Sequence, residues 1–257
     1  MTRASLAGVR VALTRDAAQC EHSAREVLEQ GGVPCVFPLL QIAPVADHGE
    51  LCAALQSLVA GDVVAFTSVN GVVFSMGEAR AALRDASARS VHFAAVGELT
   101  AAALRAEHLA ERPLVPATNQ TGTALAEALL QQTATKAKVL VLGAEQSRPE
   151  LADMLRSAGR TVQTLAVYRT LLGDASALWA AVEAGEIDAL VFASPTAVRA
   201  FACGRALERL PERVQVACIG ETTRGEACAL GLRVDVVPEH PSMHALLVAL
   251  AGTLRLP

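Results

Sequence analysis

The sequence is poor in aromatic residues, lysines and long apolar runs. Only 3% of its 257 residues are aromatic, with one tyrosine and one tryptophan, although 52% are hydrophobic. We therefore expect a core packed from Ala, Val and Leu. No apolar run reaches the roughly 18 residues of a membrane-spanning helix. The N-terminal stretch MTRASLAGVRVALTR has no apolar segment of the kind found in a secretion signal. The sequence thus predicts a cytoplasmic protein with no membrane partner.

Several site motifs are also missing. There is no Gly-x-Gly-x-x-Gly or Walker pattern, so dinucleotide binding and phosphoryl transfer have no support. The six cysteines are scattered without a C-x-x-C pair, as is typical of free thiols in a reducing compartment. His240 and His244 have the spacing of metal ligands, but Pro241 lies between them and no third ligand is evident. We interpret this segment as a helix start and predict no metal site.

The charge balance is informative about partners. The formal net charge is −4, which argues against a nucleic-acid partner. It does not exclude an anionic small ligand, because local amides and arginines bind anions whatever the net charge. Lys136 and Lys138 are the only lysines. The remaining basic residues are arginines, which suit bidentate carboxylate binding. Genome base composition explains the same bias equally well.

Two similar segments, 126 residues apart, give the clearest structural signal. The first has an apolar strand at 63–66, a polar elbow at 67–70 and a helix. The second has a strand at 189–192, an elbow at 193–196 and a helix, with Ser194 as N-cap and Pro195 at the first helical position. Such an elbow presents backbone N–H groups at the positive end of a helix, where an anion can bind. Asp62 and Asp188 precede these strands at the opposite end and are interpreted as structural.

The similarity extends over both halves of the chain. Residues 95–100, AVGELT, match residues 218–223, CIGETT, and the offsets between matched positions stay between 122 and 129. A repeat of this length indicates a duplicated domain, since solenoid repeats are about 20–50 residues long. Alternating strands and helices predict parallel sheets covered on both faces, which bind ligands at the carboxyl ends of the strands. If the two sheets face each other, the elbows line one cleft.

The remaining elements follow from periodicity and breakers. Residues 39–46 are apolar but expected to be irregular, because Pro44 rules out a helix. The repeat by itself would divide the chain near Lys136. Further strands are predicted at 9–13, 33–37, 91–96, 113–115, 139–142, 161–168, 214–219 and 233–237. Further helices are predicted at 17–30, 48–59, 121–132, 148–158 and 174–184, with others after Gly97, Gly220 and Ser242.

An ordered set of short motifs resembles a known family. The motifs are D-x-x-x-F-T-S-x-N-x-V from Asp62, A-V-G-x-x-T-A from Ala95, V-Y-R-T from Val167 and I-G-x-T-T from Ile219. In this order and spacing they resemble uroporphyrinogen-III synthases over nearly the whole chain. The resemblance implies an α/β protein with two flavodoxin-like domains, built on parallel sheets and joined by a two-segment linker. It places domain 1 at 1–37 and 170–257 and an inserted domain 2 at 40–168, with linkers at 38–42 and 167–171.

The resemblance also implies a reaction. The family closes the linear tetrapyrrole hydroxymethylbilane into uroporphyrinogen III, inverts ring D and releases water, using no cofactor and no metal. This lyase step serves the biosynthesis of haem, sirohaem and cobalamin. The substrate carries eight carboxylates, which suit helix N-termini with Ser/Thr elbows. We expect a monomeric enzyme that binds this small molecule between two mobile domains. A transient contact with hydroxymethylbilane synthase fits this expectation.

The resemblance assigns roles to individual residues. Tyr168, the only tyrosine, matches a family tyrosine proposed to assist hydroxyl departure; the alternative is a tyrosine that only packs the hinge. Substrate binding is expected of Arg15, Thr67, Ser68, Asn70, Gly97, Thr100, Arg148, Ser194, Thr222 and Thr223. Simple helix capping is the alternative for the hydroxyl residues, and a solvated surface charge is the alternative for the two arginines.

One position departs from the family pattern. The family often has an Arg-Gly pair after the strand at 139–142, where this chain has Gly143 and Ala144. Any ligand role of that arginine is absent here or moved, for example to Arg148. A rival function keeps the same fold, namely a non-catalytic, two-domain cytosolic sensor that binds a small anion or a tetrapyrrole in the cleft. The presence of Tyr168 favours the enzyme.

Overall fold

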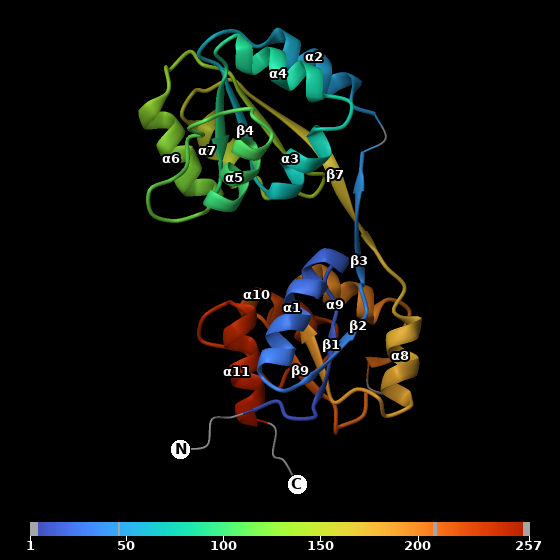
Figure 1. The fold of residues 1–257 in the computed structure, drawn as a ribbon. Coiled ribbons are helices and arrows are strands. Elements are labelled where there is room, and N and C mark those ends of the chain that lie inside the picture. The colour runs from blue at the N-terminus through green and yellow to red at the C-terminus, as the bar shows by residue number, and fades with distance from the viewer. Residues whose placement is uncertain (1–4, 46, 208–209, 254–257) are drawn as a thin grey trace. The chain divides into compact units, whose positions relative to one another are not determined.

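The computed structural model describes residues 5–45, 47–207 and 210–253 (Figure 1). The chain divides into two compact units. Unit 1 contains the residues up to Ile42 together with those from Leu171 onward, and unit 2 contains Ala43 to Thr170. Unit 2 is therefore inserted into unit 1, and two chain segments connect them.

Unit 1 is built on a four-stranded sheet with the order β2-β1-β8-β9, in which all three ladders are parallel. Its helices are α1, α8, α9, α10 and α11. The strands are β1 (Arg10–Leu13), β2 (Val33–Val36), β8 (Ala189–Phe192) and β9 (Gln215–Cys218). The helices are α1 (Ala17–Glu29), α8 (Ser176–Glu183), α9 (Pro195–Ala202), α10 (Glu221–Ala229) and α11 (Met243–Thr253).

Two apolar cores lie on the two faces of this sheet. Ala189 and Val191 of β8 belong to the core formed with α1 and α11. Leu190 and Phe192 belong to the core formed with α8 and α9. Because successive residues of a strand point to opposite faces, a strand buried on both sides becomes an uninterrupted apolar run. This explains why β8 has the sequence ALVF, and Figure 1 shows the helices on both sides of the sheet.

Unit 2 is built on a five-stranded sheet with the order β3-β7-β6-β4-β5 and contains helices α2 to α7. The strands are β3 (Leu40–Pro44), β4 (Val63–Phe66), β5 (His92–Ala95), β6 (Val139–Ala144) and β7 (Val162–Leu172). The helices are α2 (Gly49–Ser57), α3 (Val69–Ser75), α4 (Arg80–Ala88), α5 (Glu98–Ala106), α6 (Gly122–Gln132) and α7 (Glu150–Ser157).

The core of unit 2 follows the same alternation. Val63 and Ala65 of β4 pack against α6 and α7. Phe66 points to the other face, where its ring stacks on that of Phe93 from β5 with 6.4 Å between the ring centroids. The predicted parallel ladders, with continuous apolar runs in the central strands, are therefore present in both units.

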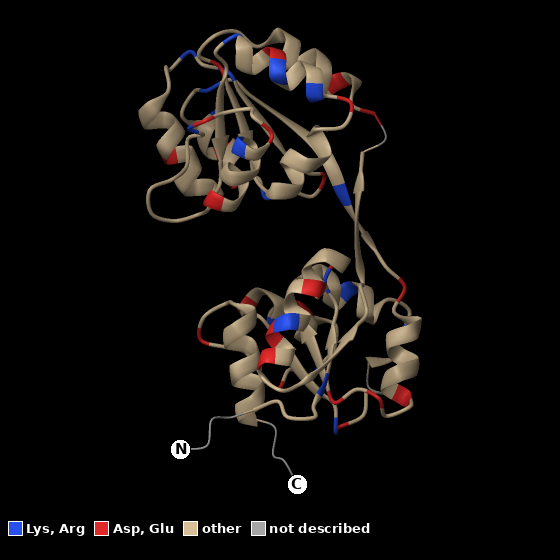
Figure 2. Cartoon of the chain, viewed as in Figure 1, with Lys and Arg blue, Asp and Glu red and all other residues tan. Residues whose placement is uncertain are grey.

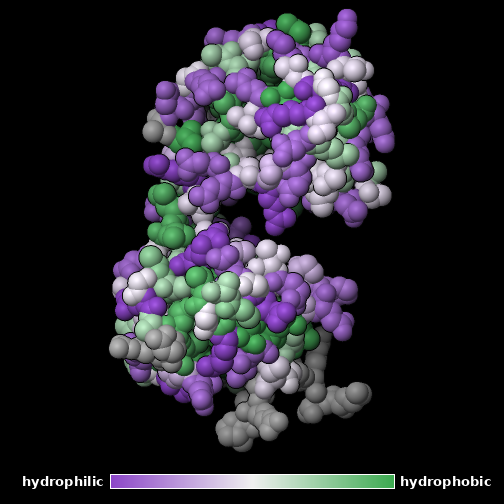
Figure 3. Space-filling model, turned by 180° about the vertical axis from the view of Figure 1, so that it is seen from behind, coloured by the Kyte–Doolittle hydropathy of each residue, from purple (hydrophilic) through white to green (hydrophobic). Residues whose placement is uncertain are grey.

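Charged residues lie mainly on the helices and connecting segments, and few lie on the strands (Figure 2). Seen from behind, each unit shows hydrophobic residues interspersed with hydrophilic ones (Figure 3). Such mixing is ordinary for a folded protein surface. Among the described residues, no helix combines the length and apolarity needed to cross a membrane.

The duplicated elbows are confirmed at the level of single hydrogen bonds. Ser68 caps α3 by accepting a hydrogen bond from the Gly71 N–H at 3.1 Å, and Ser194 caps α9 by accepting one from the Ala197 N–H at 3.2 Å. The structural role predicted for the two aspartates is also confirmed. Asp62 accepts hydrogen bonds from the backbone N–H groups of Val59 and Lys138, and Asp188 accepts one from that of Arg10. In each unit an aspartate thus fixes the start of a parallel ladder.

The segment 39–46 was predicted to be irregular, and this prediction is wrong. It contains β3, which pairs with β7, and β7 itself runs beyond Tyr168 to Leu172. Leu39 accepts a hydrogen bond from Gly173, whereas Val45 donates one to Val167, so the two strands run antiparallel. Pro44 fits because β3 is an edge strand, where proline costs no ladder hydrogen bond on its outer side. Together β3 and β7 form the two-stranded connection between the units.

Two short predicted strands are nearly absent. The segments at 113–115 and 233–237 each contribute one isolated parallel bridge, Ala94 to Leu114 and Ala217 to Val236. Their apolar residues pack against the sheet edge without extending a ladder. The helix predicted from Arg148 begins two residues later, at Glu150. Ser242 accepts a hydrogen bond from the Ala245 N–H, which confirms that the His240–His244 segment is a helix start.

Asp188 predicts a pH-dependent stability of unit 1. Its hydrogen bonds to the Arg10 guanidinium hold the pKa of this carboxyl below its ordinary value. Because the folded-state pKa lies below the unfolded one, the contribution is complete above about pH 4 and is lost as the pH falls through the lowered pKa. We expect Asp188→Asn to lower the unfolding free energy by about 1 kcal/mol at neutral pH.

Urea unfolding followed by the fluorescence of Trp179, which belongs to unit 1, measures this effect. The deficit of Asp188→Asn should shrink as the pH is lowered. Glu21→Gln, on the exposed side of α1, provides a control of equal charge change and little expected effect. A deficit that is the same at neutral and acidic pH would contradict the assignment.

Candidate active site

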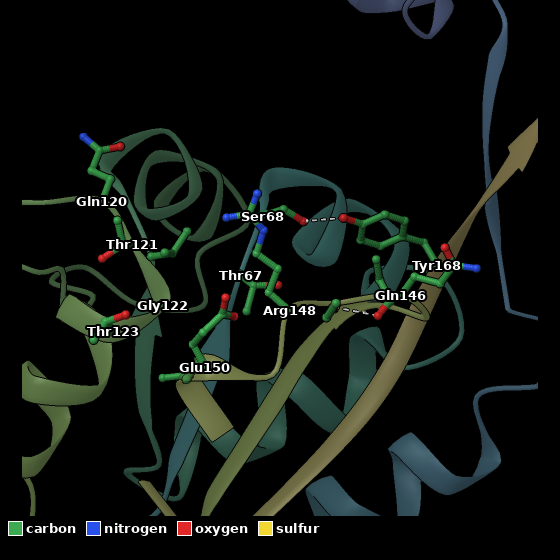
Figure 4. Close-up of a pocket in the computed structure, with 14 residues that line it drawn as sticks. Thr67, Ser68, Gln120, Thr121, Gly122, Thr123, Gln146, Arg148, Glu150 and Tyr168 are labelled. Atoms are coloured by element: carbon green, nitrogen blue, oxygen red, sulfur yellow. Dashed lines mark hydrogen bonds between the residues drawn. The ribbon is translucent and has the colours of Figure 1, made fainter. Parts of the chain in front are cut away.

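A cavity of about 520 Å³ lies in unit 2 at the carboxyl ends of β4 and β6, beside Tyr168 within β7 (Figure 4). Its walls also include the segments that open α6 and α7. Ten of the fourteen lining residues have polar side chains, and the others are aliphatic residues or glycine. The polar lining residues are Thr67, Ser68, Gln120, Thr121, Thr123, Gln146, Ser147, Arg148, Glu150 and Tyr168.

Tyr168 is placed by an irregularity in β7. Gly143 of β6 pairs with Ala166, but the next residue, Ala144, pairs with Tyr168, so Val167 is an extra residue in the ladder. Such a bulge interrupts the alternation of side chains and re-aims the residues that follow. Val167 and Tyr168 are accordingly both buried, although they are neighbours in sequence. The bulge places Tyr168 at the wall of the cavity.

The phenol of Tyr168 contacts the side chains of Ser68 and Phe74. Its Oη lies 3.0 Å from Ser68 Oγ, within hydrogen-bonding distance. Its ring stacks on Phe74 of α3, with 5.8 Å between the centroids and 27° between the planes. Only 8% of Tyr168 is exposed. Figure 4 shows the two hydroxyl groups pointing toward each other at one side of the cavity.

Gly143 allows three chain segments to meet beneath the cavity. A Cβ atom at this position would lie 2.5 Å from Thr67 Oγ1 and 2.6 Å from Ser147 Oγ. Neither distance is tolerated, so only glycine fits without displacing these hydroxyls. Thr67 Oγ1 also donates a hydrogen bond to the Leu142 carbonyl at 3.3 Å. The departure from the family's Arg-Gly pattern therefore coincides with a close approach of two hydroxyl side chains.

Arg148 lines this cavity and also a second one of about 340 Å³, which lies between α7 and the strands β6 and β7. It forms no ion pair with another residue in the described ranges. Other arginines are committed to the fold. Arg89, Arg160 and Arg213 donate hydrogen bonds to carbonyls at the carboxyl ends of α2, α6 and α8, respectively. These three arginines are therefore structural, and Arg148 is differently placed.

The two buried cysteines, Cys20 and Cys218, do not provide a nucleophile. Burial raises the pKa of the Cys20 thiol, and it raises the pKa of Cys218 to about 12. Both therefore remain protonated near neutral pH, and only the thiolate form is a good nucleophile. Within the described residues, no three His, Cys, Asp or Glu side chains are grouped so that they could hold a metal ion.

The structure brings some of the predicted site residues together. Thr67, Ser68, Arg148 and Tyr168 line the same cavity. Gly97 is the N-cap of α5 and lies against the Gln120 side chain, which lines the cavity. Asn70 is half-buried on α3 and is not among the lining residues, and Thr100 is buried with 4% exposed.

The other predicted residues belong to unit 1. Arg15 follows β1, Ser194 follows β8, and Thr222 and Thr223 open α10 after β9, so they lie at the carboxyl edge of that sheet. Arg15 Nε donates a hydrogen bond to Gln19. Thr222 is exposed, whereas Thr223 is buried with 3% exposed.

Sequence reasoning missed several cavity residues. Gln120, Thr123, Gln146, Ser147 and Glu150 line the cavity but were not predicted. A signal for the first two was present, because Thr121 was recognised as the start of a helix that follows a strand-like segment. Thr121 indeed caps α6 by accepting a hydrogen bond from the Ala124 N–H. The same rule that selected the elbows would have selected this turn.

Comparison with known proteins identifies the family. The family profile described as "Uroporphyrinogen-III synthase HemD" matches residues 21–248. The chain belongs to this family. A curated uroporphyrinogen-III synthase from Chlorobaculum parvum is 26% identical over 250 residues, which cover 95% of this chain and 99% of the relative. The resemblance found in the sequence is therefore confirmed, and with it the enzyme class.

Solved structures agree on the fold. A mutant uroporphyrinogen III synthase from Thermus thermophilus aligns with a TM-score of 0.60 and 24% identity, over 93% of this chain and 96% of that chain. Uroporphyrinogen-III synthetase from Helicobacter pylori aligns with a TM-score of 0.61 and 20% identity, over 96% and 100%. The predicted two-domain α/β fold class is confirmed. Membership in the uroporphyrinogen-III synthase family favours the enzyme over the sensor.

Gly143→Ala tests the packing beneath the cavity. The added methyl group must displace Thr67 and Ser147, so we expect a loss of about 1–3 kcal/mol in unfolding free energy. We also expect a fall in kcat/KM, because both hydroxyls line the cavity. Gly252→Ala is the control, because a Cβ there meets nothing within 4 Å and alanine favours the helix. Thermal unfolding and steady-state assays measure both effects. Unchanged values for Gly143→Ala would contradict the close approach.

Proposed function

We propose that the cavity of unit 2 binds hydroxymethylbilane and that Tyr168 assists the loss of its hydroxyl group. The observation that carries the proposal is the lone phenol of Tyr168 at the wall of a 520 Å³ cavity that also contains Arg148. The reaction is that of the uroporphyrinogen-III synthase family, namely ring closure with inversion of ring D and release of water.

The cavity offers groups suited to a substrate with many carboxylates. The guanidinium of Arg148 can form two parallel hydrogen bonds to one carboxylate. The first N–H groups of α6, at Gly122 and Thr123, have no acceptor within the helix and lie at its positive end. We assign carboxylate binding to Arg148 and to the opening turn of α6. Thr67 joins them only by turning its hydroxyl away from the Leu142 carbonyl, to which it donates in this structure.

We assign to Tyr168 the stabilisation of the departing hydroxyl group. The bond between the terminal carbon and the hydroxyl breaks with its electron pair on oxygen, and a hydrogen bond from the phenol stabilises the charge that develops there. The cationic azafulvene that remains needs positioning against the attacking pyrrole, and no nucleophile from the protein. The cavity must therefore hold the substrate and supply one donor at one place.

We also propose that the carboxyl edge of the unit 1 sheet binds carboxylates through Arg15, Ser194 and Thr222. The support is the repetition of the capped elbow in both units. Thr100 and Thr223 are buried, so any part they take is through their backbone N–H groups. For Gly97 and Asn70 we propose the same main-chain role at the openings of α5 and α3.

The proposed setting is the cytoplasm. All six cysteines lie in described parts of the chain and all are free thiols, including the exposed Cys203 and Cys228. Free exposed thiols persist in a reducing compartment. A monomeric state and a transient contact with hydroxymethylbilane synthase stay predictions, and light scattering of the two enzymes separately and mixed would test them.

Tyr168→Phe should lower kcat roughly a hundredfold, because it removes a single donor used in the transition state. KM should change little. Hydroxymethylbilane is generated from porphobilinogen by a deaminase, and the products are oxidised and separated as isomers I and III. Uncatalysed closure gives isomer I, so the yield of isomer III reports the enzyme. An unchanged rate in a folded Tyr168→Phe protein would remove the proposed role.

Arg148→Gln should raise KM roughly tenfold, because it removes a charge-assisted contact that substrate and transition state share. Arg84→Gln is the matched control, because Arg84 is exposed on α4 of the same unit and does not line the cavity. Equal kinetics of the two variants would contradict carboxylate binding by Arg148.

A further inference from the structure

We propose that Ser68 donates a hydrogen bond to Tyr168 and so directs the phenolic proton into the cavity. Ser68 then acts as a positioning residue for Tyr168 and does not bind a substrate carboxylate itself. The proposal rests on the role of Tyr168 given above. It starts from the 3.0 Å distance between Ser68 Oγ and Tyr168 Oη, in which either hydroxyl could be the donor.

The cap of α3 determines what Ser68 has left to offer. Its Oγ accepts a hydrogen bond from the Gly71 N–H at 3.1 Å. A serine hydroxyl has one proton and two acceptor sites, so the cap leaves that proton available. The acceptor within reach of this proton is Tyr168 Oη. If Tyr168 were the donor instead, its only proton would be directed away from the substrate.

The position of the phenol is fixed by the backbone and by ring stacking. The bulge at Val167 fixes the backbone, and the stacking on Phe74 limits rotation of the ring. With Oη accepting from Ser68, the remaining direction for the phenolic O–H is into the cavity. The O–H is thus oriented before the substrate arrives, which lowers the reorganisation needed in the reaction.

The same hydrogen bond supports the proton transfer itself. As the proton moves from Oη to the departing hydroxyl, water is formed and negative charge appears on Oη. The Ser68 O–H stabilises this charge, and the cap from Gly71 polarises the Ser68 hydroxyl further. Ring closure at a pyrrole carbon later releases one proton, which restores the phenol. Protons and charge therefore balance over the cycle.

The repeat shows that capping does not require a tyrosine. Ser194, the equivalent residue of unit 1, caps α9 in the same way, with the Ala197 N–H at 3.2 Å. Tyr168 is the chain's only tyrosine, so unit 1 has no counterpart to this contact. Its presence in unit 2, beside the cavity, is an addition to the shared elbow.

A double-mutant cycle tests whether Ser68 acts through Tyr168. Ser68→Ala should lower kcat roughly tenfold with little change in KM, since one supporting hydrogen bond is lost. In a Tyr168→Phe background the same change should have no further effect, because the groups act as a unit. A carboxylate-binding Ser68 would instead raise KM equally in both backgrounds, and this result would overturn the proposal.

Two further variants separate this role from helix capping. Ser68→Gly removes the hydroxyl, but glycine is nearly as good an N-cap as serine. Ser68→Thr keeps both the cap and the hydroxyl. We expect Ser68→Gly to lose kcat like Ser68→Ala, and Ser68→Thr to retain most of it. A Ser68→Gly protein with wild-type kcat would overturn the proposal.

The single tyrosine also allows a direct observation. Its ring-carbon NMR signal, from tyrosine labelled at Cζ, and its Raman doublet each report whether the phenolic oxygen accepts a hydrogen bond. Both should shift in substrate-free Ser68→Ala and stay near wild type in Ser68→Thr. No shift in Ser68→Ala would overturn the inference. If Tyr168→Phe had wild-type kcat while Ser68→Ala shifted both signals, the proposed role of Tyr168 in the reaction would be wrong. The hydrogen bond from Ser68 to Tyr168 would still be established.

Discussion

Parallel strand pairing is the constraint on which this structure depends. Parallel neighbours cannot be joined by a tight turn, so each ladder needs a crossover connection, here mostly helical. The parallel strands of each sheet all point the same way, so their carboxyl ends lie along one side of the sheet. The turns into the next helices gather along that side. The structure anchors this arrangement at the opposite edge with Asp62 and Asp188, whose carboxylates accept backbone N–H groups of neighbouring strands. The polar elbows at the carboxyl ends of the strands lie outside the apolar core, so they can contact a ligand.

The two units show how one such scaffold is used in two ways. Both keep the aspartate, the four-residue apolar strand and the capping serine. Unit 2 adds a fifth strand, β3, at its edge, a bulge at Val167 and a glycine at 143 that lets two hydroxyls approach. These additions lie on β3, β6 and β7, which are neighbours at one side of the sheet. The chemistry proposed for this uroporphyrinogen-III synthase thus comes from a local change at one side of a duplicated sheet.

Local signals explain which features could be predicted from the sequence. The strands at 63–66 and 189–192 are short apolar runs before Ser/Thr elbows, and their caps followed directly from residue type. The strand at Leu40–Pro44 could not be predicted, because Pro44 excludes a helix but says nothing about an antiparallel partner strand at Val162–Leu172. The same limit applies to Tyr168. Its place in the chain was evident, but its direction depends on a bulge that appears only when β6 and β7 are paired.

The candidate site was also only partly predictable from the sequence. Thr67, Ser68, Arg148 and Tyr168 were predicted and lie at one cavity. Gln146 and Ser147 were missed, although residues 147–150, SRPE, have the spacing of a capping box. In the structure Ser147 does not cap α7, and its hydroxyl donates to the Ala144 carbonyl instead. Only Arg15 and Arg148 were predicted to bind carboxylates, and the sequence did not show that Arg89, Arg160 and Arg213 satisfy helix carbonyls. An arginine in sequence does not reveal whether its partner is a ligand or the protein's own backbone.

The insertion of unit 2 has a consequence for how the chain is made. The central strand of unit 1, β1, lies between β2 and β8, yet β8 is encoded about 180 residues later. During synthesis from the N-terminus, β1 and β2 leave the ribosome first and must wait without their partner. Unit 2, which is continuous from 43 to 170, is complete before β8 exists. The order of translation therefore lets the cavity-bearing half fold before the half that holds both ends of the chain.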